Sequence, residues 1–124
     1  MTSFWNIPNV QEIKTPLSLL REQSSILYEQ TEGRLIGETQ AVGTGDNIII
    51  DLKIIVPALN KYTYTVLQYK QQAILLYPGK LISNLHRESY EINSEENFIE
   101  ALKYILSSKE MKTLLLSLLS QAKT

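Results

Sequence analysis

The only histidine of the chain, His86, lies in the polar segment NLHRES, close to two serines and a carboxylate. Ser83, Ser89 and Glu88, taken with a histidine, are the residue types from which a hydrolytic serine–histidine–acid site is built. Neither serine lies in the G-x-S-x-G turn that exposes the nucleophile in many hydrolases, so the spacing does not support that chemistry. The sequence therefore predicts that His86 is a solvated loop residue without a catalytic or ligating role.

Other patterns that could carry chemistry are equally sparse. The chain has no cysteine, which excludes disulfides, thiolate metal ligands and cysteine nucleophiles. Glu95 and Glu96 are adjacent, and adjacent helical residues do not face each other, so helix capping explains them better than catalysis. No P-loop, dinucleotide-binding, zinc or calcium spacing is present. We expect no catalytic residue, no cofactor and no metal; an enzyme would need Glu38, His86 or Arg87 to converge on a cleft.

Length and composition bound the class of protein. At 124 residues the chain fits one domain, and 44% hydrophobic with 20% charged residues is typical of a globular protein. A net charge of −1 gives no general attraction to nucleic acid. No apolar run reaches the roughly 20 residues of a membrane span, and the N-terminus lacks the pattern of a signal peptide. We expect a cytoplasmic protein that binds neither nucleic acid nor a membrane.

The chain begins with an irregular arm over residues 1–14, in which Pro8 and Asn9 suggest a turn. Phe4 and Trp5 are large apolar side chains of this arm. They either hold the arm against the domain or serve as an exposed anchor for a partner, because tryptophan is enriched at binding hot spots.

Three helices are expected around a sheet. The first covers residues 15–32, with a threonine cap followed by proline, and ends at Gly33. Two more follow over 94–122, the second starting at the capping box Ser107-x-x-Glu110.

A meander of three to five antiparallel strands is predicted over residues 34–92, which makes the fold class α+β. GTGD (43–46) supplies a hairpin turn before the strand NIIIDLKIIV (47–56), and KYTYTVLQY (61–69) forms the next strand. KQQ is then expected to turn the chain, and AILLY (73–77) to form a further strand. LIS and YEI would add short edge pieces.

The pairing of the second and third strands decides which face the tyrosines take. One register places them on the face of the main isoleucine row, and the other, in which Val56 pairs with Lys61, flips every side chain of the third strand. The first register buries more apolar area and is favoured. It pairs Val56 with Tyr62, Ile54 with Tyr64 and Leu52 with Val66.

Apolar residues on both faces of the strands raise the question of what covers the second face. Ile49 and Ile55 lie opposite the main isoleucine row, beside Asp51 and Lys53. An antiparallel sheet with one solvated face should alternate more cleanly, so we expect helices, a second copy or a partner to cover part of this face. The leucines of the last helix occupy more of its circumference than one core-facing stripe requires, and a homodimer would cover the additional ones. The simpler interpretation is a core helix with a few exposed leucines.

These features favour a non-enzymatic protein-interaction module, an accessory, inhibitor or immunity-type factor that masks a partner's surface or pairs with itself. The expected contacts are Tyr62, Tyr64, Leu115 and Leu119. The alternative is a small-ligand-binding domain, with a pocket of several hundred cubic ångströms between sheet and helix and polar groups such as Tyr64 or Arg87. Stacking of nucleobases on the tyrosines would need more cationic neighbours than this chain offers.

Overall fold

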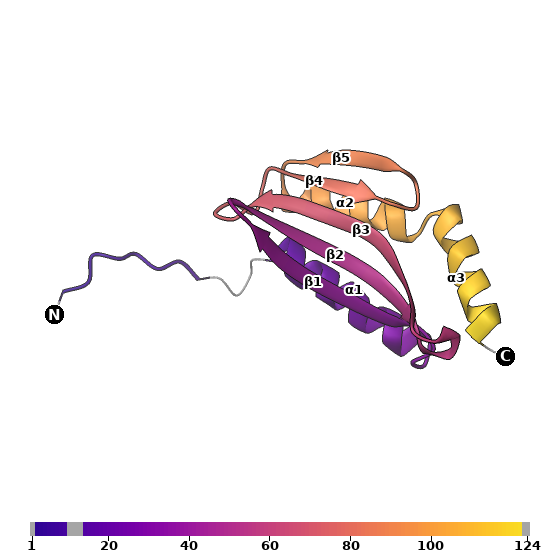
Figure 1. Cartoon of the computed structure of the whole chain (residues 1–124). Coiled ribbons are helices and arrows are strands. Elements are labelled where there is room, and N and C mark those ends of the chain that lie inside the picture. The colour runs from indigo at the N-terminus through magenta and orange to yellow at the C-terminus, as the bar shows by residue number, and fades with distance from the viewer. Residues whose placement is uncertain (1, 10–13, 123–124) are drawn as a thin grey trace.

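The protein, described by a computed structural model over residues 2–9 and 14–122, has the predicted α+β architecture (Figure 1). Its strands are β1 (Ile36–Thr44), β2 (Asn47–Val56), β3 (Tyr62–Gln72), β4 (Gly79–Ser83) and β5 (Glu88–Ile92). They form one antiparallel sheet in the order β1-β2-β3-β4-β5, so each strand pairs with its neighbours in sequence. The meander expected from the sequence is confirmed, with five strands.

The helices are α1 (Pro16–Gln30), α2 (Glu95–Leu106) and α3 (Lys109–Ala122), and a short 3-10 turn, η1 (Pro57–Leu59), joins β2 to β3. In Figure 1, α1 and α2 lie behind the sheet, and α3 lies beyond one end of it. α3 contacts η1 at this end. The apolar stripes of all three helices contribute to a single core.

The helices begin at residues that satisfy their first amides. The predicted caps Thr15 and Ser94 are present, and each accepts a hydrogen bond from the amide three residues on. α3 begins differently, because Ser108 caps it by accepting an amide of the first turn at 3.1 Å. The capping box predicted on Ser107 is therefore wrong, and the carboxylate of Glu110 makes a tertiary contact instead.

β2 has the predicted alternation. Ile50, Leu52, Ile54 and Val56 are buried beneath the helices, whereas the intervening residues are only partly covered. Because α1 and α2 lie on the same side of the sheet, none of the described elements lies over the other face (Figure 1). The second face is thus left open by the chain.

The favoured register of β2 and β3 is confirmed at its start, where Val56 pairs with Tyr62 and Ile54 with Tyr64. The register then shifts at a bulge, so that Leu52 lies opposite Leu67, and the predicted pairing with Val66 is wrong. The bulge directs two consecutive apolar side chains into the core, since Val66 and Leu67 are both buried.

The prediction fails over residues 70–77. The segment expected to turn the chain (70–72) continues β3, and 73–77 forms a loop rather than a strand. The short strands expected at LIS and YEI are confirmed within β4 and β5; β5 is an edge strand, whereas β4 lies between β3 and β5. The loop is tied to the core by Tyr69, whose hydroxyl donates a hydrogen bond to the carbonyl oxygen of Leu76 at 2.8 Å.

Candidate functional site

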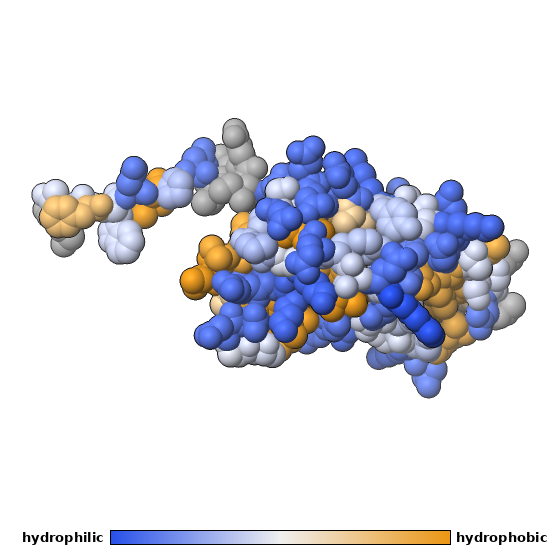
Figure 2. Space-filling view, turned by 90° about the horizontal axis from the view of Figure 1, so that it is seen from above, coloured by the Kyte–Doolittle hydropathy of each residue, from blue (hydrophilic) through white to orange (hydrophobic). Residues whose placement is uncertain are grey.

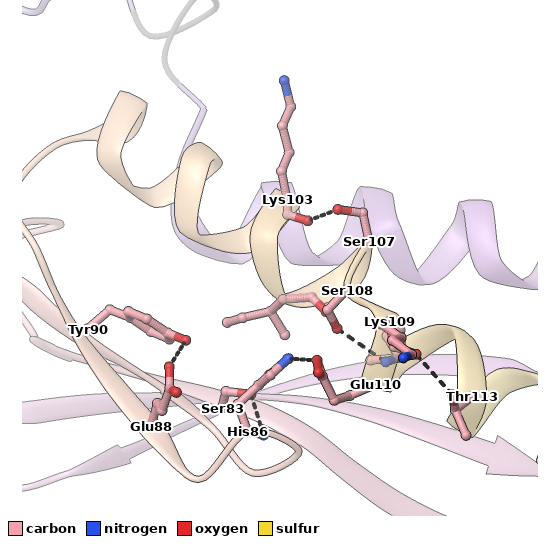
Figure 3. Close-up of polar contacts among 12 residues, drawn as sticks. Ser83, His86, Glu88, Tyr90, Lys103, Ser107, Ser108, Lys109, Glu110 and Thr113 are labelled. Carbon is pink, nitrogen blue, oxygen red and sulfur yellow. Dashed lines mark hydrogen bonds and ion pairs between the residues drawn. The ribbon is translucent and has the colours of Figure 1, made fainter.

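A polar cluster joins the turn after β4 to the start of α3 (Figure 3). The Oγ of Ser83 lies 2.8 Å from Nδ1 of His86 and also accepts the backbone N–H of His86 at 3.2 Å. The other ring nitrogen, Nε2, lies 3.0 Å from a carboxylate oxygen of Glu110. The His86 side chain is only 6% exposed, so the prediction of a solvated loop residue is wrong.

The order serine, histidine, carboxylate resembles a hydrolytic site. Ser83, however, is not accessible to a substrate as the nucleophile of such a site must be. The side chain of Ser83 is fully buried, and a nucleophile has to contact its substrate. Glu38 and Arg87, named above as further candidates, do not join the cluster. Glu38 lies opposite Lys53 in the β1–β2 ladder, and Arg87 is an exposed turn residue at φ +56°. The geometry of the cluster suits a link between the β4–β5 hairpin and α3.

The open face of the sheet carries a mixture of aliphatic and polar side chains. Strand register places five aliphatic residues on it: Ile36, Val42, Ile49, Ile55 and Ile82. Four of them form two lateral pairs, because Ile36 lies opposite Ile55 and Val42 lies opposite Ile49, whereas Ile82 lies apart, between Gln68 and Ser89. We use the term open face for this surface and its polar neighbours.

The polar residues of the open face are organised across the strands. Gln68 donates a hydrogen bond to Asp51 at 2.7 Å, and Lys53 donates one to Gln40 at 3.4 Å. Asp51 and Lys53, which are two residues apart on β2, therefore each bind a neighbouring strand. These bonds tie down the polar side chains at the centre of the open face, between the two aliphatic pairs. Val42 is exposed, and the other four aliphatic residues are half-buried.

The four residues expected to bind a partner lie elsewhere. Tyr62 and Tyr64 lie on the helix-covered side of the sheet, in line with Ile54, and Tyr62 is 49% exposed at the start of β3. Tyr64 is half-buried, and burial raises the pKa of its phenol, with a smaller contribution from Tyr62. Leu115 and Leu119 are half-buried on α3 and pack against the core.

Apolar side chains are also exposed outside the sheet. Figure 2 shows hydrophobic side chains at both ends of the domain and along the N-terminal arm. Leu116 is exposed on α3, and Ile74 is 88% exposed in the β3–β4 loop. Phe4 and Trp5 are 95% and 81% exposed, so the structure does not show them packed on the domain. The sequence indicated Phe4 and Trp5 as possible exposed anchors because they are large apolar residues in an irregular arm. It did not indicate that Ile74 is exposed, because residues 73–77 were expected to form a strand.

A small cavity of about 170 Å³ lies between α1, α3 and the sheet. Aliphatic side chains form most of its wall, and Gln23, Ser24 and Gln30 of α1 add polar groups. Neither Tyr64 nor Arg87, which were expected in a ligand pocket, lines it. The cavity is also smaller than the pocket expected from the sequence.

Within the part of the chain that the structure describes, no three acidic or histidine side chains are grouped to hold a metal ion. None of the described helices has the length and apolar character needed to cross a bilayer. No protein-family model, no curated protein and no solved structure gives a significant match to this chain.

Proposed function

We propose that the protein is a non-enzymatic, cytoplasmic protein-interaction module, and that it acts by laying its open face against a partner. The observation that carries this proposal is the aliphatic set of that face, which no described part of the chain covers. Partner binding would remove these side chains from water, which is the main source of affinity in most protein associations.

The chemistry of the open face favours a protein partner over a charged polymer. Glu38, Asp51 and Glu91 are interspersed with Lys53, Lys70 and Lys80, so the face carries no net excess of either sign. Phosphate backbones require a basic surface. On the open face two pairs of aliphatic residues flank a polar centre, and this mixture fits a non-obligate protein interface, which as a whole is about as apolar as the rest of a protein surface.

The proposal is tested by affinity capture from lysate of cells that produce the protein, using Ile49→Glu and Ile55→Glu. A glutamate at position 49 lies opposite Lys70, which should accommodate it without loss of folding. The matched control is Ile74→Glu, because Ile74 is exposed but lies in the β3–β4 loop.

We expect the wild-type chain and the control to retain the same companion proteins, and the two face variants to lose them with unchanged circular dichroism. Companions that persist on both face variants, or a wild-type chain that retains none, would contradict the proposal.

A second candidate function, binding of a small apolar ligand, is favoured by the cavity between α1 and α3. A buried apolar cavity of about 150 Å³ is large enough to hold benzene. Benzene or indole should then raise the unfolding temperature of the wild-type chain. The larger side chain of Leu115→Phe, in the α3 wall of the cavity, should abolish that rise. An unfolding temperature that neither compound changes would rule this candidate out.

A further inference from the structure

A groove of about 530 Å³ runs between α1 and α2, on the side of the molecule away from the open face. Its apolar lining consists of Leu19, Ile99, Leu102 and Leu106, with Glu22 and Lys103 among its polar residues. Gln23 and Leu106 line both this groove and the 170 Å³ cavity beneath α3, so the two hollows adjoin.

The N-terminal arm leaves the domain at one end of this groove. Lys14 is itself a groove residue, and its backbone N–H donates a hydrogen bond to the carboxylate of Glu95, at the start of α2, at 3.2 Å. The arm beyond it carries Phe4, Trp5 and Ile7, all strongly exposed. A mostly exposed aromatic segment is thus tethered beside an apolar groove.

The arm is uncharged over residues 2–9, and it is long enough to lie along the groove. Residues 2–9 (TSFWNIPN) contain no charged side chain, so docking them would bury no ion. Trp5 precedes Lys14 by nine residues, which can span roughly 30 Å when extended. The stretch of α1 from Pro16 to Gln23 rises only about 10 Å. The chain therefore has enough length to reverse direction and lie along the groove.

We propose that the α1–α2 groove is a binding site for an extended aromatic peptide, and that its occupant is the chain's own arm. Phe4, Trp5 and Ile7 supply the apolar contacts, and the adjoining cavity has room for one aromatic ring of benzene size. Tethering favours the chain's own arm over the arm of a second copy, because a short linker gives an effective concentration in the millimolar range. The site is independent of the partner surface proposed above, since the two lie on opposite sides of the sheet.

The test uses Trp5, which is the only tryptophan, in a chain without cysteine. A nitroxide attached to Lys103→Cys lies in the groove, and one attached to Lys70→Cys lies on the open face. Both positions are exposed, so neither label should disturb folding. We expect the nitroxide at position 103 to quench Trp5 fluorescence several-fold more than the nitroxide at position 70, and the ratio to stay constant on dilution.

Two further variants locate the contact. Ile99→Lys places a charge in the groove and should relieve the quenching at position 103, whereas Ile74→Lys, at a residue of the β3–β4 loop that does not line the groove, should not. The double variant Phe4→Ser with Ile7→Ser alters only exposed arm residues, and it should also relieve the quenching without affecting the domain.

Equal, weak quenching from both label positions, as in the urea-unfolded chain, would overturn the proposal. Quenching that disappears on dilution would assign the groove to a second copy, and quenching that survives both the groove and the arm variants would place Trp5 elsewhere. Either result would also overturn the proposal.

Discussion

The imidazole Nε2 of His86 lies 3.0 Å from a carboxylate oxygen of Glu110, a residue 24 positions later in the chain. The contact joins the β4–β5 turn to the first turn of α3, as Figure 3 shows. On its other side the same ring contacts the buried hydroxyl of Ser83. A single side chain thus connects a buried strand residue to a peripheral helix.

Replacement of His86 should weaken the fold more than replacement of Glu110. His86→Ala leaves the buried Ser83 hydroxyl without its side-chain partner, which should lower the free energy of unfolding by about 1–3 kcal/mol. Glu110 is 56% exposed, so Glu110→Ala should lower it by at most about 1 kcal/mol. Urea unfolding measures both values. Equal losses, or no loss from His86→Ala, would show that the cluster does not hold α3.

The close approach of α1 to β1 predicts a strong effect at one glycine. A Cβ atom added at Gly37 would lie 2.6 Å from the Cα of Ser24, and the Ser24 and Thr39 hydroxyl oxygens are 2.6 Å apart at the same contact. Gly37→Ala should therefore force the helix outward and destabilise the chain by about 1–3 kcal/mol.

The control for this substitution is on the same strand. A Cβ at Gly43 would meet no atom within 4 Å, and Gly43→Ala should leave stability unchanged or raise it by about 0.4–1 kcal/mol. Thermal unfolding of the two variants tests the contact, and similar values for both would argue against tight packing of α1 on β1.

Tyr69 and Tyr77, whose rings are in contact, should respond in opposite ways to loss of the hydroxyl. Tyr69→Phe removes the hydrogen bond to the carbonyl oxygen of Leu76 and should cost about 1–3 kcal/mol. The buried hydroxyl of Tyr77 has no hydrogen-bond partner among the described residues, so Tyr77→Phe should be neutral or stabilising. Chemical denaturation distinguishes them, and a large loss from Tyr77→Phe would reveal a partner for that hydroxyl.

The same two tyrosines should make the fold sensitive to alkali. Burial raises the pKa of Tyr77 to about 12, with a smaller effect from Glu95, and burial raises the pKa of Tyr69 further. A raised pKa means that the folded chain favours the protonated phenol. This contribution is complete below the ordinary pKa of about 10 and is lost as pH rises through 10 towards 12.

Ultraviolet absorbance during an alkaline titration follows phenolate formation directly. We expect the exposed tyrosines to ionise first and the buried ones to ionise together with unfolding at higher pH. Ionisation of all seven tyrosines in one step near pH 10, with the fold intact, would contradict the assigned burial.

Local signals in the sequence were sufficient for most of the elements. The cap and proline that begin α1, the turn at Gly45 and the alternation of β2 each depend on residues close together in the chain, and each was predicted correctly. The error over residues 70–77 has a tertiary cause. Tyr69 is packed edge-to-face with Phe98 at 5.0 Å and binds the loop backbone, and no nearby residue indicates that contact.

The candidate surfaces were only partly predictable. The sequence indicated that Ile49 and Ile55 would lie on a face needing cover, but whether helices occupy one side or both depends on long-range packing. The environment of His86 was missed for the same reason, since Glu110 is remote in sequence. The bulge at Val66 also gave no signal, because a strand with apolar residues on both faces tolerates a shift of register.

The neighbour-to-neighbour order of the strands has a consequence for how the chain acquires its shape. Each strand can join the sheet as soon as it leaves the ribosome, without waiting for a distant segment. Such local topology lowers the contact order and speeds folding relative to sandwiches of similar size. α2 and α3 follow the strands in the chain, so a nascent chain should display the part of the sheet that these two helices cover before they are made.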